Sequence, residues 1–189
     1  MAQSFTNQVI SFNEEKSFTH YYTNVFHEII TLTKRLEAFY IEPSETVSKF
    51  ISDFGSIHSL VKTHNEQVIQ NELKIHKDFF DHCLKYPLDK QQRRSIVSAE
   101  DNCLVVSSAG SGKTSSIVGK VKYLIEIKKV NPKNILIISY TNKAAAELTE
   151  RMGIANLRGY TFHKLALDII GQTTGQKPSI CCLLYTSPS

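Results

Sequence analysis

The chain has 189 residues, a formal net charge of +4 at pH 7, and 41% hydrophobic and 21% charged residues. These proportions are ordinary for a globular protein and exclude a collagen-like fibre and an intrinsically disordered tail. Its longest apolar runs are far shorter than the roughly 18 residues that cross a membrane, and the N-terminus lacks a basic region followed by an apolar block. We therefore expect a cytoplasmic protein with no membrane contact, long enough for one domain and part of another.

Charge divides the chain into two parts. Residues 1–87 carry 8 Lys+Arg and 11 Asp+Glu, a net charge of −3, whereas residues 88–189 carry 14 and 7, a net charge of +7. A basic surplus of this size suits a polyanionic partner such as nucleic acid or nucleotide phosphates. A solvated basic face is the plainer alternative, and charge by itself does not decide between them.

Residues 1–87 predict a helical region. Apolar residues recur at helical spacing from Phe18 to Ile30, then from Val47 through Gly55 to Val61, and a third helix is expected over about residues 66–84. Six of the seven histidines lie in this part without a shared i, i+4 face, so we interpret them as surface or internally hydrogen-bonded residues rather than metal ligands. The four cysteines show no paired CxxC spacing and are expected to be reduced.

Residues 88–180 predict the first part of an α/β domain. The expected elements are helix, strand, helix, strand and helix, over residues 88–97, 103–106, 113–129, 134–140 and 142–152. Gly153 follows the last of these helices, where a glycine C-cap belongs. Unbroken apolar strands that alternate with helices predict a parallel sheet covered by helices.

A glycine loop lies between the first predicted strand and the next helix. Its sequence SSAGSGKT matches the end of the phosphate-binding pattern GxxxxGK[ST] and has a serine where the pattern begins with glycine. Glycines accept positive φ and turn successive N–H groups toward phosphate oxygens. We expect Lys113, the candidate catalytic residue, to reach the β and γ phosphates, and the Thr114 hydroxyl to bind Mg²⁺ at the start of the following helix.

The alternative is a glycine-rich turn without a ligand, but the position between strand and helix favours a nucleotide. The expected nucleotide-binding residues of the loop are Ser107, Ser108, Ala109, Gly110, Ser111, Gly112, Lys113 and Thr114.

Three further segments resemble, in order, motifs of the superfamily 1 DNA helicases of the UvrD/Rep type. They are LDKQQRRSI, ISYTNKAAAEL and YTFHKLALDII, at residues 88–96, 138–148 and 160–170. The resemblance implies that Gln92 reads the adenine edge, for which a side-chain amide offers both donor and acceptor. It also implies contacts to single-stranded DNA, by base stacking and phosphate binding, from Tyr140, Thr141, Asn142, Thr161, Phe162 and His163. Without the family, Gln92 is an exposed polar residue, Tyr140 packs at a strand end and His163 is structural.

Within that family, the acidic helical region, Ser115 and TFHKLALDII resemble the helicase IV branch. Many members have an adenine-stacking arginine where this chain has Ser115. The implied fold is a partial P-loop NTPase (RecA-like) parallel sheet over residues 88–180, preceded by the helical region 1–87. The implied activity is ATP- and Mg²⁺-dependent movement along single-stranded DNA in the 3′ to 5′ direction.

ATP hydrolysis in this family needs an Asp-Glu pair and arginines from a second RecA-like domain. The chain contains no Asp-Glu dipeptide. We therefore expect an N-terminal fragment that binds nucleotide without unwinding DNA, and we interpret residues 181–189 as a non-native tail.

Two other functions remain open. A P-loop kinase or GTPase shares the glycine loop, but a GTPase needs an NKxD motif, and Asn142-Lys143 is followed by two alanines. The helical region is alternatively a docking or regulatory module for a protein partner.

Overall fold

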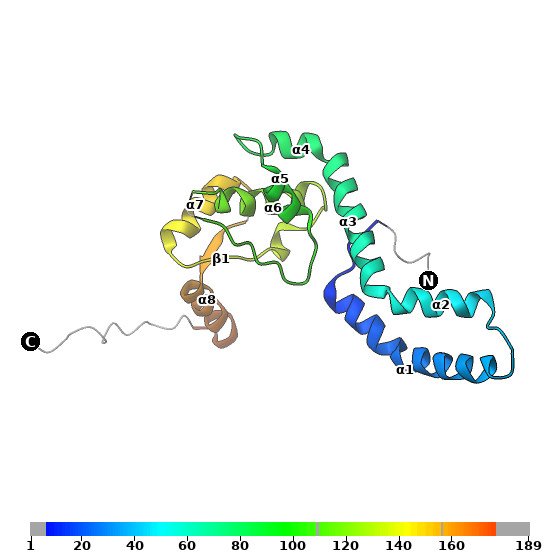
Figure 1. Cartoon of the computed structure of the whole chain (residues 1–189). Coiled ribbons are helices and arrows are strands. Elements are labelled where there is room, and N and C mark those ends of the chain that lie inside the picture. Colours follow the sequence, from blue (N-terminus) through cyan, green and yellow to red (C-terminus); the bar gives the residue numbers. More distant parts are fainter. Residues whose placement is uncertain (1–6, 109, 156, 177–189) are drawn as a thin grey trace, which may run out of the picture. The chain divides into compact units, whose positions relative to one another are not determined.

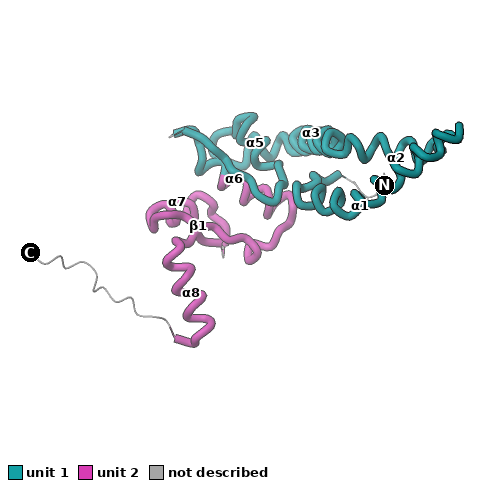
Figure 2. Tube along the Cα trace, turned by 60° about the horizontal axis from the view of Figure 1, so that its bottom comes forward, with its two compact units in different colours: residues 1–116 teal, residues 117–189 magenta. Residues whose placement is uncertain are grey.

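The computed structural model describes residues 7–108, 110–155 and 157–176. The chain forms two compact units, residues 1–116 and residues 117–189 (Figure 2). Ala109 of the predicted loop and the predicted non-native tail, residues 181–189, lie outside the described residues. Among the described helices, none is long and apolar enough to span a membrane.

The first unit begins with two helices that lie side by side, α1 (Phe12–Glu37) and α2 (Glu45–Gly55) (Figure 1). Ser11 and Glu14 form a capping box that satisfies backbone N–H groups at the start of α1. The predicted apolar face of α1 packs against α2 through neighbouring aromatic rings, with centroids 4.7 to 6.3 Å apart. The rings belong to Phe18, Tyr22, Phe26, Phe50 and Phe54.

The next two helices differ from the prediction in their boundaries. α3 (Ile57–Ile75) starts earlier than residue 66, and α4 (Lys77–His82) is separate from it. The backbone leaves helical geometry at Ser56 (φ −114°, ψ 17°) and at His76 (φ −101°, ψ 24°). The apolar spacing continues across both breaks, so periodicity alone did not reveal them.

Helix α5 (Lys90–Val97) confirms the short helix predicted over residues 88–97, and it buries Ile96 and Val97. The strand predicted over residues 103–106 is wrong. These residues form no strand, and the side chains of Leu104 and Val106 are 88% and 86% exposed. A strand is stable only beside a hydrogen-bonded neighbour, and none of the described residues pairs with this run.

The second unit contains a small parallel sheet and its helices (Figure 1). After α6 (Lys113–Glu126), which begins in the first unit, and a 3₁₀ turn (Pro132–Asn134), the elements are β1 (Ile137–Ser139), α7 (Asn142–Met152), β2 (Gly159–Thr161) and α8 (Phe162–Thr174). The strands pair in parallel, with Ile137 opposite Gly159 and Ser139 opposite Thr161. Helix α7 packs against both strands, and α8 packs against β2. The described chain is thus helix-rich with a two-stranded parallel sheet, which is compatible with an α/β fold.

The prediction is most accurate in this unit. The helix over residues 142–152 is confirmed at both ends, and Gly153 follows it in the left-handed conformation (φ 60°). The strand over residues 134–140 is confirmed in its centre, because the 3₁₀ turn occupies its beginning. The helix predicted over residues 113–129 ends at Glu126.

Gly159 lets α7 approach β2 closely. A Cβ atom at this position would lie 2.8 Å from the backbone oxygen of Ala145 and 3.2 Å from its Cα. The N–H of Gly159 donates to Oγ1 of Thr149 at 2.9 Å, so a second contact also joins the strand to α7.

We therefore expect Gly159→Ala to destabilise the second unit. The added methyl meets backbone atoms, which move only together with the helix, and such overpacking costs about 1–3 kcal/mol. Urea unfolding followed by circular dichroism measures the change. Gly55→Ala is the matched control, because a Cβ there has no atom within 4 Å. Equal unfolding midpoints for the two variants would contradict the prediction.

Candidate functional site

The described part of the glycine loop has a conformation that suits phosphate binding. Gly110 and Gly112 have positive φ angles of 78° and 84°, as the sequence predicts. Lys113 Nζ donates to the backbone oxygens of Ser107 and Ser108 at 3.0 and 2.6 Å. Its positive charge therefore lies against the loop itself, where anionic oxygens would be attracted.

Ser107, at the start of the loop, has a buried side-chain hydroxyl. Among the described residues, no hydrogen-bond partner reaches this Oγ atom. The hydroxyl of Ser111, in contrast, donates to the backbone oxygen of Ser108 at 2.7 Å. A buried hydroxyl without a partner is costly, so the loop retains a polar group for a ligand. Together with the lysine charge and the two glycines, it fits a phosphate group.

Gln92 lies beside this loop. It forms a capping box with Asp89 at the start of α5. The N–H of Gln92 donates to Asp89 Oδ1 at 2.8 Å, and the N–H of Asp89 donates to Gln92 Oε1 at 2.9 Å. Gln92 Nε2 donates to the backbone oxygen of Ser111 at 3.4 Å. A Cβ atom on Gly112 would collide with Gln92 Nε2. The structure thus brings the predicted adenine-reading residue next to the predicted phosphate loop.

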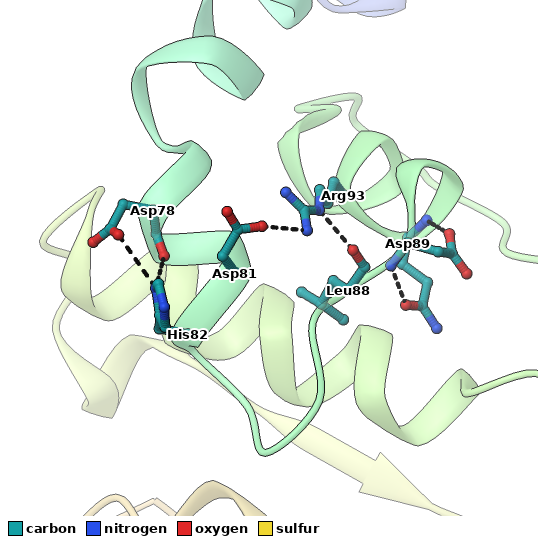
Figure 3. Close-up of polar contacts among 7 residues, drawn as sticks. Asp78, Asp81, His82, Leu88, Asp89 and Arg93 are labelled. Atoms are coloured by element: carbon teal, nitrogen blue, oxygen red, sulfur yellow. Dashed lines mark hydrogen bonds and ion pairs between the residues drawn. The ribbon is translucent and has the colours of Figure 1, made fainter.

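Two arginines that follow Gln92 attach α5 to earlier helices. Arg93 donates to Asp81 Oδ1 of α4 at 2.7 Å and, through Nε, to the backbone oxygen of Leu88 at 2.6 Å (Figure 3). Arg94 donates with both terminal nitrogens to the carboxylate of Glu66 on α3, at 2.8 and 2.5 Å. These pairs fix the helix that presents Gln92.

The same pairs change the acidity of the carboxyl groups. The hydrogen bond from Arg94, assisted by one from Gln70, lowers the pKa of Glu66 from 4.5 to about 2. The hydrogen bond from Arg93 likewise lowers the pKa of Asp81, and Glu66 raises the pKa of Arg94. Both carboxylates are therefore charged at neutral pH and hold α5 in place.

The predicted DNA contacts lie at one edge of the two-stranded sheet. Tyr140 and Phe162 directly follow Ser139 and Thr161, which are paired residues at the ends of parallel strands. The two aromatic side chains are 93% and 65% exposed. The carboxyl edge of parallel strands is where α/β proteins commonly bind ligands.

The threonines of this edge begin the two helices. Thr141 Oγ1 accepts from the N–H of Ala144 at 3.1 Å, and Thr161 Oγ1 accepts from the N–H of Lys164 at 3.4 Å. Asn142 and His163 are exposed beside them.

A groove of about 520 Å³ lies between α7, β2 and the start of α8. Its volume is within the range of small-ligand sites, roughly 300–1,000 Å³. Asn142 and Thr161, both predicted DNA contacts, line it together with Arg158 and Lys164. The predicted nucleotide residues thus lie in the first unit and the predicted DNA residues in the second.

Sequence reasoning missed three charged residues near these sites. Asp89 had a readable signal, because Asp-x-x-Gln before a helix is a capping-box pattern. No sequence pattern marked Arg158 and Lys164 beyond the basic surplus of residues 88–189. Both line the groove only because the fold brings the residue before β2 and the first turn of α8 to it.

One family model matches the part of the chain that contains the predicted nucleotide-binding residues and the predicted DNA-binding residues. Residues 88–179 match the family model described as UvrD/REP helicase N-terminal domain. This segment belongs to the UvrD/REP helicase family. The recognition made from the motifs is therefore confirmed.

Several UvrD/REP relatives are similar to the chain. DNA helicase IV of Escherichia coli (strain K12) is 34% identical over 128 residues, which are 66% of this chain and 19% of the relative. The ATP-dependent DNA helicase Rep of Buchnera aphidicola subsp. Baizongia pistaciae is 39% identical over 89 residues, or 43% of this chain and 13% of the relative. DNA helicase II of Escherichia coli (strain K12) is 38% identical over 66 residues, which are 35% of this chain and 9% of the relative. The chain therefore spans less than a fifth of the length of each of these relatives.

The UvrD/REP segment is joined by ion pairs to residues that precede it. Gln92, Arg93 and Arg94 lie inside the matched segment, whereas Asp81 and Glu66 lie before it. The match to DNA helicase IV is longer than the UvrD/REP segment, so it includes residues outside that segment.

The Glu66–Arg94 pair predicts an acid-sensitive stability. A carboxyl group with a lowered pKa in the folded state stabilises that state above its unfolded pKa, and the contribution disappears as the pH falls through the folded pKa. For Glu66 this window runs from about 4.5 down to about 2. We expect Glu66→Gln to flatten the pH dependence of the free energy of unfolding within this window, measured by urea titrations.

The Glu66 side chain is 46% exposed, so added salt should weaken the effect. Glu28→Gln removes an exposed carboxylate of α1 and serves as the control. A pH profile of Glu66→Gln that superimposes on that of the unaltered chain would contradict the prediction.

Proposed function

We propose that this chain is the nucleotide-binding and DNA-contacting N-terminal part of an ATP-dependent DNA helicase that moves 3′ to 5′ along single-stranded DNA. The observation that carries the proposal is the position of Gln92 against the glycine loop. Gln92 is the residue predicted to bind the adenine base, and the glycine loop is predicted to bind the phosphates. Their contact brings the two parts of the proposed nucleotide site together. The family match of residues 88–179 and the similarity to the ATP-dependent DNA helicase Rep support the same function.

In this proposal, a P-loop NTPase (RecA-like) arrangement holds ATP. Lys113 exchanges its bonds to the backbone oxygens of Ser107 and Ser108 for bonds to phosphate oxygens. The Thr114 hydroxyl holds Mg²⁺, which neutralises phosphate charge when bound. The backbone N–H of Asp89 uses one lone pair of the Gln92 amide oxygen, so this oxygen can still accept from the base while an N–H of Nε2 donates to it.

In the second unit, Tyr140 and Phe162 offer exposed rings on which bases of single-stranded DNA stack, and Thr141, Asn142, Thr161 and His163 are next to them in the sequence. Aromatic platforms of this kind tolerate any sequence, because every base has a π face. A motor that moves along DNA needs such tolerance.

A protein-docking role for the helical region, residues 1–87, is a second candidate. The turn between α1 and α2 exposes three large apolar residues in a row, Phe39, Tyr40 and Ile41, at 75%, 98% and 52%. Tyr40 also has a positive φ of 59°, a conformation that costs a non-glycine residue energy. This tip is the feature that favours a protein partner.

Lys113→Ala should abolish most nucleotide binding. We expect a fluorescent ATP analogue with Mg²⁺ to bind the 189-residue chain, with competition by ATP stronger than by GTP, and the affinity to fall at least tenfold in the variant because the charge at the phosphates is lost. Equal competition by GTP would favour another P-loop enzyme.

Lys62→Ala, which removes an exposed lysine from α3, is the control for charge. Without an Asp-Glu pair, the chain is expected to show no DNA-stimulated ATP hydrolysis. Hydrolysis by the chain that Lys113→Ala abolished would contradict this part of the proposal.

Tyr140→Ala and Phe162→Ala should each weaken binding of a labelled oligothymidylate. Loss of one stacking ring costs roughly 1–3 kcal/mol, and fluorescence anisotropy measures the affinity. Phe39→Ala, which removes an equally exposed ring from the first unit, is the matched control. The stacking role is wrong if all three variants bind like the unaltered chain.

A further inference from the structure

The peptide bond between Leu88 and Asp89 is held at both of its polar groups. Its carbonyl oxygen, on Leu88, accepts from Nε of Arg93 at 2.6 Å (Figure 3). Its N–H, on Asp89, donates to Oε1 of Gln92 at 2.9 Å. In a trans peptide the C=O and the N–H point in opposite directions within one plane, and the described residues contain no cis peptide bond. The position of Arg93 therefore sets the direction of the N–H that meets Gln92.

Arg93 is in turn fixed by α4. Its Nη2 atom donates to Oδ1 of Asp81 at 2.7 Å (Figure 3). Its guanidinium carbon lies 5.9 Å from the ring centroid of Phe80, which is fully buried. The side chains of Arg93 and Asp81 are 18% and 33% exposed, so salt screens this ion pair less than a fully exposed one. A short path of hydrogen bonds thus runs from Asp81 through Arg93 and one peptide bond to the amide of Gln92.

This path fixes the orientation of the Gln92 amide group. Its oxygen accepts from the N–H of Asp89, and its nitrogen lies toward the glycine loop, where it donates to the backbone oxygen of Ser111 at 3.4 Å. If the amide turned over, its NH₂ group would meet the N–H donor of Asp89, and its oxygen would meet the oxygen of Ser111. Neither pair can form a hydrogen bond. The amide therefore presents one acceptor and one donor in a fixed order.

We propose that Asp81 is a positioning residue that makes the nucleotide site selective for adenine over guanine. The inference rests on the proposed function, in which Gln92 binds the base, and adds a residue that precedes the UvrD/REP segment. Adenine offers a donor at N6 and an acceptor at N7, which an amide of fixed orientation matches, whereas guanine offers two acceptors, O6 and N7. An amide that turns freely can direct its NH₂ group toward guanine O6. Loss of the Asp81 carboxylate releases Arg93, and with it the order of donor and acceptor at Gln92.

Competition binding to the 189-residue chain tests this inference. A fluorescent ATP analogue with Mg²⁺ is displaced by ATP, by GTP and by inorganic tripolyphosphate, which has the phosphates but no base. In Asp81→Asn, we expect the affinity for ATP to fall roughly two- to tenfold, the effect of one hydrogen bond, and the preference for ATP over GTP to fall with it. The affinity for tripolyphosphate should stay unchanged, because Asp81 acts on the residue that binds the base.

Asp78→Asn is the matched control, because Asp78 belongs to the same helix, is 95% exposed and pairs with His82 of α4. It should leave the preference for ATP unchanged. Arg93→Lys keeps the charge but lacks the fork that reaches Asp81 and Leu88 together, so it should reduce the preference as Asp81→Asn does. Thermal melting checks that each variant is folded.

The outcomes separate the positioning role from the proposed function. An unchanged preference for ATP in folded Asp81→Asn, or an equal loss of affinity for all three competitors, would overturn the positioning role and leave the proposed function standing. If Asp81→Asn does not fold, the preference of Arg93→Lys decides in the same way. Equal affinities of the unaltered chain for ATP and GTP would overturn both.

Discussion

The candidate nucleotide site depends on how α5 is attached to the helices before it. Three consecutive residues of this helix contact three different parts of the first unit. Gln92 contacts the glycine loop, Arg93 binds Asp81 of α4, and Arg94 binds Glu66 of α3. Because side chains of consecutive helical residues diverge by about 100°, one short helix reaches all three. The ion pairs therefore fix the orientation of the side chain that faces the loop.

This arrangement changes the interpretation of the charge division. The net charges of −3 and +7 suggest an acidic region and a basic region with separate roles. In the structure, carboxylates of the acidic part, Glu66 and Asp81, are bound to arginines of the basic part, Arg94 and Arg93. Some of the basic surplus is thus used within the chain, in ion pairs to the acidic part.

The sequence correctly predicted elements whose ends are marked by nearby residues. It wrongly predicted a strand whose formation depends on a pairing partner far along the chain. The helix of residues 142–152 has an N-capping threonine before it and Gly153 after it, so both ends are encoded nearby. The apolar run of residues 103–106 has strand composition, but strand formation depends on a neighbour that composition does not specify. For the candidate sites, the motifs predicted residues for nucleotide and DNA binding, and these assignments stay predictions. They did not predict Asp89, Arg158 or Lys164, whose roles come from contacts made by the fold.

The sheet edge that carries the predicted DNA contacts combines helix caps with exposed aromatic rings. Thr141 and Thr161 accept backbone N–H bonds as helix caps, which uses a lone pair of each hydroxyl oxygen. The hydroxyl hydrogen is a separate donor that capping does not consume. The exposed Thr141 can therefore cap its helix and keep this donor for another group, whereas Thr161 is buried, with 7% of its surface exposed. Because parallel pairing places Ser139 opposite Thr161, the caps and the rings of Tyr140 and Phe162 lie along one edge. Even a two-stranded sheet is sufficient to assemble such an edge.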